Sequence, residues 1–225
     1  FQGMSKELDD YKEQGIESQW TNSMFGGMPA YLINSVNKTL FRPIHKIFTF
    51  NNLRPVSFVF LYLIGAYIAL LLFGANPWLS FIGAIAFAFS SYNFIIIAAG
   101  HNTKAMAIAY MFPVIAGIYS TFKGRYLIGA SVVAVFLGLQ LYVNHLQITY
   151  YTFLIVLIFG LVELVFIIKS KEYNRFFKAA GILIVVAALA FASNLGKMWT
   201  TYEYGNFSIR GKSELTSDAH LKTSG

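Results

Sequence analysis

The sequence lacks cysteine altogether and is poor in charged residues. Without cysteine, the chain forms no disulfide bonds and carries out no thiol chemistry. Charged residues make up 12% of its 225 residues, about half the share found in a typical soluble domain. The shortage of charge therefore argues against a soluble fold.

Several catalytic signatures are missing as well. The chain contains no phosphate-binding Walker loop, no dinucleotide-binding fingerprint, no HExxH zinc motif and no GxSxG nucleophile motif. An ATP-driven transporter and a zinc protease therefore have no basis in the sequence.

Hydrophobic residues dominate what is present, at 56% of the chain, and they include 22 phenylalanines and 14 tyrosines. They gather in six apolar runs, at 56–74, 78–98, 105–122, 126–143, 147–168 and 179–196. Each run is long enough to cross a hydrocarbon core about 30 Å thick. Because lipid offers the backbone no hydrogen-bond partners, each run is predicted to be a helix. The sequence thus predicts an all-α integral membrane fold with about six transmembrane helices, in a membrane domain at 56–198.

The polar segments at the two ends are predicted to lie outside the hydrocarbon core. Residues 1–55 form an expected extracytoplasmic loop, which begins with a short exposed helix within 5–18 that ends near Gly15. Residues 199–225 are expected to begin a second extracytoplasmic segment.

An amphipathic helix is predicted at 31–50, inside the first polar segment. Its apolar residues recur at helical spacing, and they are Leu32, Ile33, Val36, Leu40, Ile44, Ile47 and Phe48. Lys38, Arg42 and Lys46 share the opposite face. This pattern predicts a helix that lies on the membrane surface, interrupted near Pro43.

The basic residues between the apolar runs predict the orientation. Six of them lie in two loops on one side, and these are Lys123, Arg125, Lys169, Lys171, Arg175 and Lys178. The two short loops on the other side hold Lys104 alone. Since cytoplasmic loops are enriched in Lys and Arg, both ends of the chain are predicted to be extracytoplasmic. Topology then accounts for the net charge of +7, and no nucleic acid partner is expected.

Two loops on the predicted extracytoplasmic side carry the candidate binding residues. These residues are His101, Asn102, Lys104, Asn144 and His145. Histidine, amide and lysine side chains at a membrane boundary can bind a phosphate or another anion. The alternatives are a helix cap with a lysine that reaches the interface, and ordinary loop polarity. Two histidines are too few to predict a metal site.

Three segments carry a resemblance to a known family. The first is Trp20–Tyr31, in which the motif residues are Trp20, Asn22, Phe25, Gly26, Gly27, Met28 and Pro29. The second runs from Gly100 through Lys104 to Pro113, and the third is Ser208–Ser217. In this order they resemble segments of YfhO-type bacterial membrane proteins, especially those of Bacteroidetes. The first segment is the most specific of the three.

The resemblance implies a fold and a function similar to those of GT-C glycosyltransferases. Such an enzyme sits as a multi-pass protein in the bacterial inner (cytoplasmic) membrane and works on its extracytoplasmic face. It would transfer a sugar from a polyprenyl-phosphate donor to a cell-envelope glycan acceptor. The resemblance implies a catalytic acid and one further helix upstream of Phe1, so no catalytic residue is predicted within this chain. The cofactor is left open, a divalent metal included.

Two other functions compete with this interpretation. A transporter or flippase for a lipid-linked substrate would use charged or broken helices near the membrane midplane. The first four runs have no acidic or basic residue there, which counts against ion-coupled transport. The third hypothesis is a non-catalytic envelope assembly protein that binds glycan.

Overall fold

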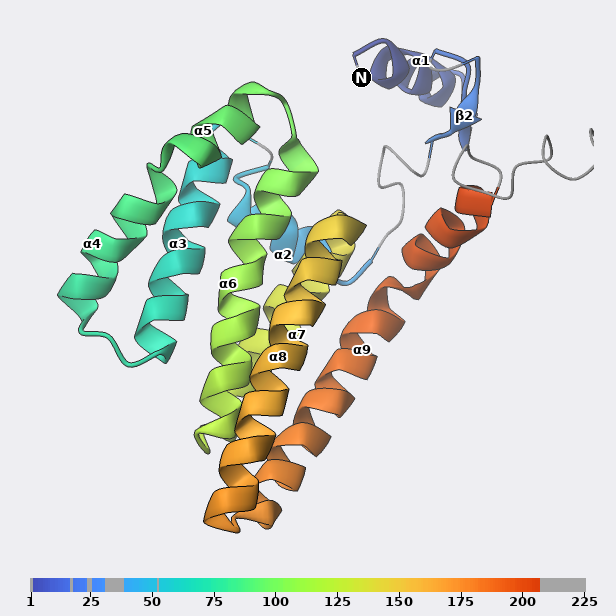
Figure 1. Cartoon of the computed structure of the whole chain (residues 1–225). Helices are drawn as coiled ribbons and strands as arrows, with labels where there is room; N and C mark the ends of the chain where they lie inside the picture. Colours follow the sequence, from blue (N-terminus) through green and yellow to red (C-terminus); the bar gives the residue numbers. More distant parts are fainter. Residues whose placement is uncertain (1, 17, 24–25, 31–38, 52, 207–225) are drawn as a thin grey trace, which may run out of the picture. The chain divides into compact units, whose positions relative to one another are not determined.

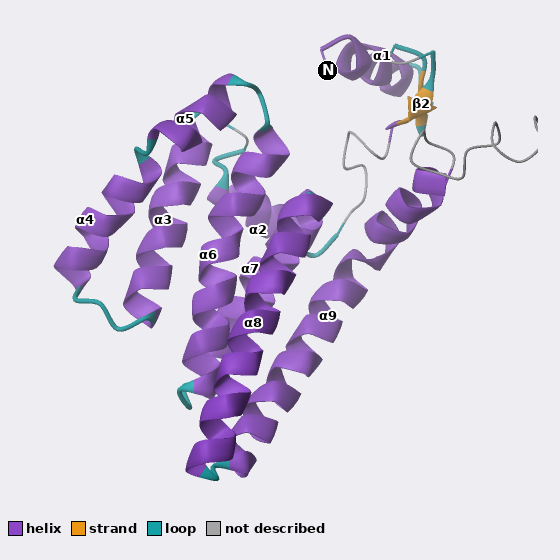
Figure 2. Cartoon of the chain, viewed as in Figure 1, coloured by secondary structure: helices purple, strands orange, loops and turns teal. Residues whose placement is uncertain are grey.

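The computed structural model describes residues 2–16, 18–23, 26–30, 39–51 and 53–206, and these residues are almost entirely helical (Figures 1 and 2). The chain divides into two compact units. One unit is Thr39–Asn194, and the other combines Phe1–Lys38 with Leu195–Gly225. Each unit is described by itself.

The larger unit is a helical bundle. Its helices are α2 (Phe41–Phe48), α3 (Val56–Leu72), α4 (Pro77–Ala88), α5 (Ser91–Ala98), α6 (Asn102–Phe122), α7 (Tyr126–Val143), α8 (Leu146–Ser170) and the part of α9 (Tyr173–Asn206) that ends at Asn194. The predicted apolar runs all fall on these helices. The last helix is longer than its run, because no proline interrupts the sequence between Tyr173 and Asn206.

Helices α6, α7, α8 and α9 are each long and apolar enough to cross a membrane. Helices α4 and α5 would together supply a fifth span, bent by 45° at their junction. Helix α3 is apolar but has only 17 residues, the lower limit for a span. The six predicted runs thus correspond, among the described residues, to four single helices, one bent pair and one short helix.

The bend between α4 and α5 has a local cause. Helix α4 ends at Ala88, and Ser90 is the extended residue that precedes α5. Asn93, which lies on α5, donates a hydrogen bond from Nδ2 to the backbone oxygen of Phe87 at 2.7 Å. The amide of this buried asparagine therefore satisfies a carbonyl at the end of α4 and holds the two helices together at their junction.

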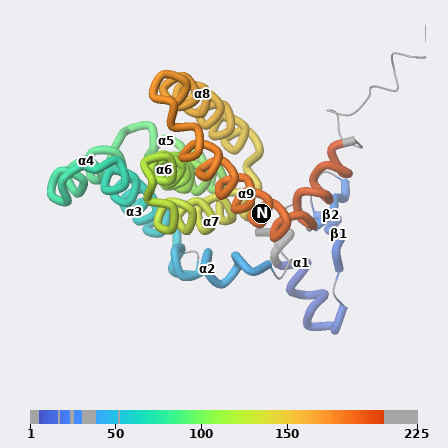
Figure 3. Tube along the Cα trace, turned by 90° about the horizontal axis from the view of Figure 1, so that it is seen from below, coloured from blue at the N-terminus to red at the C-terminus, as the bar shows by residue number. Residues whose placement is uncertain are grey.

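Helix α6 is the centre of the bundle, with α3 and α7 against it and α8 and α5 also in contact (Figure 3). The most apolar stretch of α6 is 78% buried, whereas the corresponding stretches of α8 and α9 are each 11% buried. Helices α8 and α9 therefore present most of their apolar side chains outward. Several long helices with such exteriors indicate a multi-pass membrane protein, because lipid can cover these surfaces.

Small residues let α3 approach α6 closely. A Cβ atom on Gly65 of α3 would collide with the backbone oxygen of Ala109 on α6. Pro113 has no N–H to bond that carbonyl four residues earlier, so the oxygen lacks its usual helical partner. Gly65 leaves room for the backbones to meet at this point.

A second close contact joins α6 to α7. A Cβ atom on Gly129 of α7 would lie 2.6 Å from the backbone oxygen of Gly117 and would also collide with the side chain of Thr121. The reverse substitution is less tight but still close, because a Cβ atom on Gly117 would lie 3.0 Å from the oxygen of Gly129. The two glycines thus set the distance between these helices.

Helix α2 is amphipathic, but its buried face differs from the predicted one. Phe41, His45 and Thr49 are buried against the bundle at four-residue spacing, whereas Ile47, on the face predicted to lie on the membrane, is 74% exposed, and its contact with the membrane stays a prediction. The predicted interruption near Pro43 stays a prediction, because α2 begins at Phe41 and residues 31–38 lie outside the described residues. Pro43 is the third residue of α2, in the first turn, where backbone N–H groups have no intrahelical partner.

The ring of Phe41 fixes α2 to the bundle. A Cβ atom on Gly138 of α7 would collide with this ring, which therefore lies directly against the α7 backbone. The amphipathic helix belongs to the same compact unit as the membrane helices. Residues 31–38, the first part of the predicted amphipathic helix, lie outside the described residues.

The smaller unit contains α1 (Gln2–Glu13), which confirms the predicted short helix, and a pair of two-residue strands. Strand β1 (Trp20–Thr21) pairs antiparallel with β2 (Met28–Pro29). Gly27 has φ +120°, and a Cβ atom there would lie 2.9 Å from the Trp20 ring. Two constraints thus require glycine at this position: the positive backbone angle, and the indole ring that leaves no room for a side chain.

The carboxylate of Glu7 joins α1 to this hairpin. It accepts hydrogen bonds from the Thr21 hydroxyl at 2.5 Å, from the backbone N–H groups of Asn22 and Ser23 at 3.0 and 3.1 Å, and from the Ser23 hydroxyl. These bonds, that of the Ser23 hydroxyl first, lower the pKa of Glu7 to about 2. Phe25 of the motif and the whole Ser208–Ser217 segment lie outside the described residues.

The α6–α7 contact predicts the effect of Gly129→Val. The added side chain forces the two helices apart, and we expect the free energy of unfolding to fall by about 1–3 kcal/mol. Thermal denaturation of the purified protein in detergent measures the change. The matched control is Gly181→Val on α9, because a Cβ atom there meets nothing within 4 Å. Equal melting temperatures for the two variants would contradict this role of Gly129.

The hydrogen bonds accepted by Glu7 predict that Glu7→Gln loosens the hairpin. The amide keeps one acceptor oxygen, and its N–H groups would face donors that the carboxylate now bonds. Limited proteolysis within 20–30 should become faster, whereas Glu13→Gln, on the exposed last turn of α1, should leave the rate unchanged.

The pH dependence of the parent hairpin follows from the same pKa. The stabilisation by Glu7 is complete above its ordinary pKa of 4.5 and declines as the pH falls toward about 2. In the parent, the hairpin should therefore be well protected against proteolysis at pH 5 and poorly protected near pH 2. A Glu7→Gln variant as protected as the parent at pH 5 would refute the contact.

Candidate functional site

The five predicted site residues lie at one end of the bundle, which we call the histidine end. It is the end at which α6 and α8 begin and α7 finishes (Figure 1). His101 and Asn102 form the entry to α6, and Lys104 lies in its first turn. Asn144 and His145 form the turn between α7 and α8.

The backbone turns the chain sharply before α6. Gly100 adopts φ +73° after α5, and its N–H bonds the oxygen of Ile97 at 3.0 Å. The N–H of His101 then reaches back to the oxygen of Ile96 at 3.1 Å. This arrangement is typical of a glycine-terminated helix, and it brings His101 to the start of α6.

The turn between α7 and α8 is equally short. Asn144 is left-handed, with φ 58° and ψ 42°, a conformation that asparagine tolerates better than most residues. His145 follows it directly, and its backbone oxygen accepts a bond from the Thr149 hydroxyl at 3.3 Å. The tightness of the turn holds the imidazole close to the start of α6.

One side-chain contact joins the two loops. Thr103 Oγ1 and His145 Nδ1 share a hydrogen bond of 3.3 Å, although the residues are 42 positions apart. The other ring nitrogen of His145, Nε2, is buried and has no hydrogen-bond partner within the described parts of the chain. The structure therefore brings the loops of His101 and His145 together.

The electrostatics of His145 follow from its surroundings. Burial lowers the pKa of His145, and the nearby charges of Lys104 and His101 lower it further. The neutral imidazole is thus favoured as long as no anion is present. A bound anion would act in the opposite direction, because it would favour the charged ring.

Lys104 has an aromatic neighbour that the sequence did not indicate. Its Nζ lies 5.7 Å from the centroid of the Tyr92 ring on α5. A cation over a ring face at this distance is held in place without being neutralised. Tyr92 and Thr103 are therefore site residues that sequence reasoning missed. Thr103 stands inside the loop already selected, but nothing in the apolar run marked Tyr92.

The backbone adds to the positive potential at this end. Helices α6 and α8 both begin here, and neither has an acidic residue in its first turn. A helix N-terminus carries partial positive charge and unpaired N–H groups, which favour anions. Lys104, the two histidines and the two helix starts therefore combine to attract a negative group.

The described residues contain no comparable cluster of side chains for a metal ion. Within the described ranges, no three His, Cys, Asp or Glu side chains come together closely enough to hold an ion. The backbone N–H of Asn102 donates a hydrogen bond to the backbone oxygen of Gly100 at 2.8 Å. The geometry at this end thus favours an anion over a cation.

A third histidine was missed by the sequence analysis. His45 of α2 is buried, its Nδ1 lies 3.1 Å from the hydroxyl of Tyr110 on α6, and its ring centroid lies 5.0 Å from that of Tyr142 on α7. Its spacing of four residues from Phe41 was the available signal, since both then share one helix face. The contacts of His45 join α2 to two bundle helices.

Comparison with known proteins adds no identification. No protein-family model, no curated protein and no solved structure matches this chain. The resemblance to YfhO-type proteins therefore stays a prediction made from the sequence.

Proposed function

We propose that this chain is part of a membrane glycosyltransferase that binds a polyprenyl-phosphate sugar through its phosphate at the histidine end. The reaction would take place on the extracytoplasmic side of the bacterial inner membrane. The acceptor would be a hydroxyl group of a cell-envelope glycan.

The observation that carries this proposal is the convergence of two loops on one cationic, partly desolvated site. Lys104 and His101 come from the start of α6, and His145 comes from the start of α8. A lipid-linked phosphate resides at the depth where membrane helices end, so a site at the helix ends is within its reach.

The chemistry of sugar transfer explains what such a site would do. The bond between the sugar C1 and the phosphate oxygen breaks, a bond from C1 to the acceptor oxygen forms, and the phosphate leaves with added negative charge. Cations and N–H groups already in position stabilise that charge without reorganisation. The Lys104 ammonium and the histidine rings would take this role, and the acceptor proton would pass to a base.

A flippase for a lipid-linked substrate is the second candidate, and one observation favours it. The span formed by α4 and α5 is broken, with a bend of 45° and the polar residues Ser90, Ser91 and Asn93 at the break. Broken helices are frequent at substrate sites of transporters. A flippase would move a fluorescent polyprenyl-phosphate sugar across vesicle membranes, whereas a transferase would leave it in its leaflet.

The site predicts that Lys104→Ala weakens binding of the donor. A charge-assisted contact to phosphate is worth about 1.5–3 kcal/mol, so the dissociation constant should rise roughly tenfold to a hundredfold. A polyprenyl-phosphate glucose, titrated onto the purified protein in nanodiscs, is a suitable probe.

Two further variants complete this test. Lys104→Arg should keep part of the affinity, because the charge remains while the geometry changes. Lys169→Ala, which removes a lysine from the opposite end of the bundle, should bind like the parent. Should Lys104→Ala also bind like the parent, the phosphate assignment is wrong and the loop is a helix cap.

The lowered pKa of His145 predicts that affinity depends on pH. Without ligand, the folded protein disfavours the charged His145 ring, whereas the unfolded chain does not. The free energy of unfolding should therefore fall as the pH drops from 6.5 toward the lower pKa of His145 in the folded state. With a phosphodiester bound, protonation adds an attraction, so affinity should rise between pH 7.5 and pH 5.5. The same nanodisc titration measures this rise.

Two variants test whether His145 causes the rise in affinity at low pH. His145→Gln should abolish most of the rise in affinity, because the amide does not titrate. Lys104→Ala removes a charge that lowers the His145 pKa, so the rise should begin at higher pH. A pH dependence unchanged by His145→Gln would exclude this histidine as its source.

A further inference from the structure

The opposite end of the bundle, which we call the basic end, contains an open recess of about 440 Å³. It is formed where the loop between α8 and α9 lies beside the start of α7. Lys171, Arg175 and Lys178 line it together with Glu172, Asn174 and Tyr126. Three cations thus face one carboxylate, and the recess carries a surplus of positive charge.

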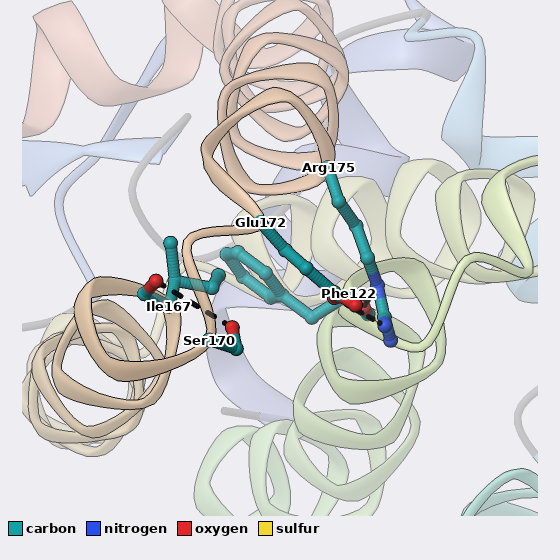
Figure 4. Close-up of polar contacts among 5 residues, drawn as sticks. All are labelled: Phe122, Ile167, Ser170, Glu172 and Arg175. Carbon is teal, nitrogen blue, oxygen red and sulfur yellow. Dashed lines mark hydrogen bonds and ion pairs between the residues drawn. The ribbon is translucent and has the colours of Figure 1, made fainter.

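The recess is held in shape by contacts of Arg175 (Figure 4). The guanidinium donates from Nε to the backbone oxygen of Phe122 at 2.9 Å and from Nη1 to Glu172 at 3.1 Å. Arg175 therefore fixes the start of α9 to the end of α6. The Lys178 ammonium lies 4.7 Å from the centroid of the Tyr126 ring, a contact that positions its charge without cancelling it.

An apolar cavity of about 400 Å³ lies among α6, α7, α8 and α9. Its lining includes Phe122 and Val114 of α6, Gly160 of α8 and Ala180 and Phe191 of α9. From Ala180 to Phe191 it follows α9 for about 16 Å at the helical rise. This length is close to half of a hydrocarbon core about 30 Å thick, the depth of one leaflet.

The cavity and the recess adjoin at the basic end. Phe122 lines the cavity, its backbone oxygen bonds Arg175, and its ring centroid lies 5.6 Å from that of Phe176. A positively charged recess thus lies next to an apolar cavity, and the cavity is about as long as one leaflet is deep.

We propose that this pair of pockets binds one anionic phospholipid, with its phosphate in the recess and an acyl chain in the cavity. The lysines and Arg175 attract the phosphate, because anionic headgroups favour clustered Lys and Arg at the membrane surface. The acyl chain would fill the space between α9 and the other helices that protein side chains leave open. This site is independent of the phosphate site at the histidine end.

The charge distribution decides in favour of this occupant. Lys171, Arg175 and Lys178 all lie at the basic end of the cavity, whereas Lys104 is the single lysine of the two loops at the histidine end. The positive-inside rule assigns such an end to the cytoplasmic leaflet, where anionic phospholipids are available. A neutral lipid would gain nothing from the recess.

The experiment adds phosphatidylglycerol or phosphatidylcholine of equal chain length to the purified protein in detergent. Thermal stability and the lipids retained on purification, identified by mass spectrometry, are the readouts. Phosphatidylglycerol should raise the melting temperature and be retained, and phosphatidylcholine should do neither. The double variant Lys171→Gln/Lys178→Gln should weaken the phosphatidylglycerol effect on the order of tenfold in lipid concentration. Lys123→Gln/Lys169→Gln removes two charges outside the recess and should respond like the parent.

A second pair of variants tests the cavity. Gly160→Leu fills it, since a Cβ atom there meets nothing within 4 Å, and should abolish retention of phosphatidylglycerol. Gly181→Leu, at an exposed position of α9 outside the cavity lining, should retain the lipid. Equal effects of the two lipids, normal retention by Gly160→Leu, or a polyprenyl lipid retained in place of phosphatidylglycerol would each overturn the proposal. Loss of donor binding in Lys104→Ala would leave all these results unchanged.

Discussion

The close approach of backbones around α6 is the constraint on which the bundle depends. Gly65 meets the carbonyl of Ala109 on one side of α6, and Gly117 meets Gly129 of α7 on the other. In lipid no hydrophobic driving force pulls helices together, so contact between small residues has to hold them. Because α6 is held from both sides, its first turn is fixed in space. The position of Lys104, three residues into α6, follows from this packing.

The two ends of the bundle have different chemical characters, and both result from short loops between long helices. At the histidine end, two helix starts and one lysine in the connecting loops form a partly desolvated site suited to an anion. At the basic end, the two loops hold six Lys and Arg residues, and two of these lie over aromatic rings, Lys178 over Tyr126 and Lys123 over Tyr119. The proposed lipid-linked substrate and the proposed membrane lipid would thus bind at opposite ends of the bundle.

The candidate site was predictable in part. Polar residues at 101–104 and 144–145 stood out because they interrupt apolar runs, and the positive-inside rule assigned them to one side. Their contact, Thr103 with His145 at 3.3 Å, depends on how α6 and α8 pack. Tyr92 gave no signal, since an aromatic residue in an apolar run looks like any lipid-facing side chain. His45 lies on the helix predicted for the membrane surface and was not singled out, yet packing against Tyr110 and Tyr142 buries it.

The sequence by itself determined that the chain is built of long apolar helices and where they approximately lie, because the length of a hydrocarbon core and the needs of the backbone allow few alternatives. Their number differs from the six spans predicted, since the second run is two helices and the first is short. It also determined which loops are basic, since charge is a property of composition. Only the tertiary structure decided which face of α2 is buried, where the second run bends, and which loop residues meet. These features depend on contacts between residues far apart in the chain, such as Phe41 against Gly138, and no local period encodes them.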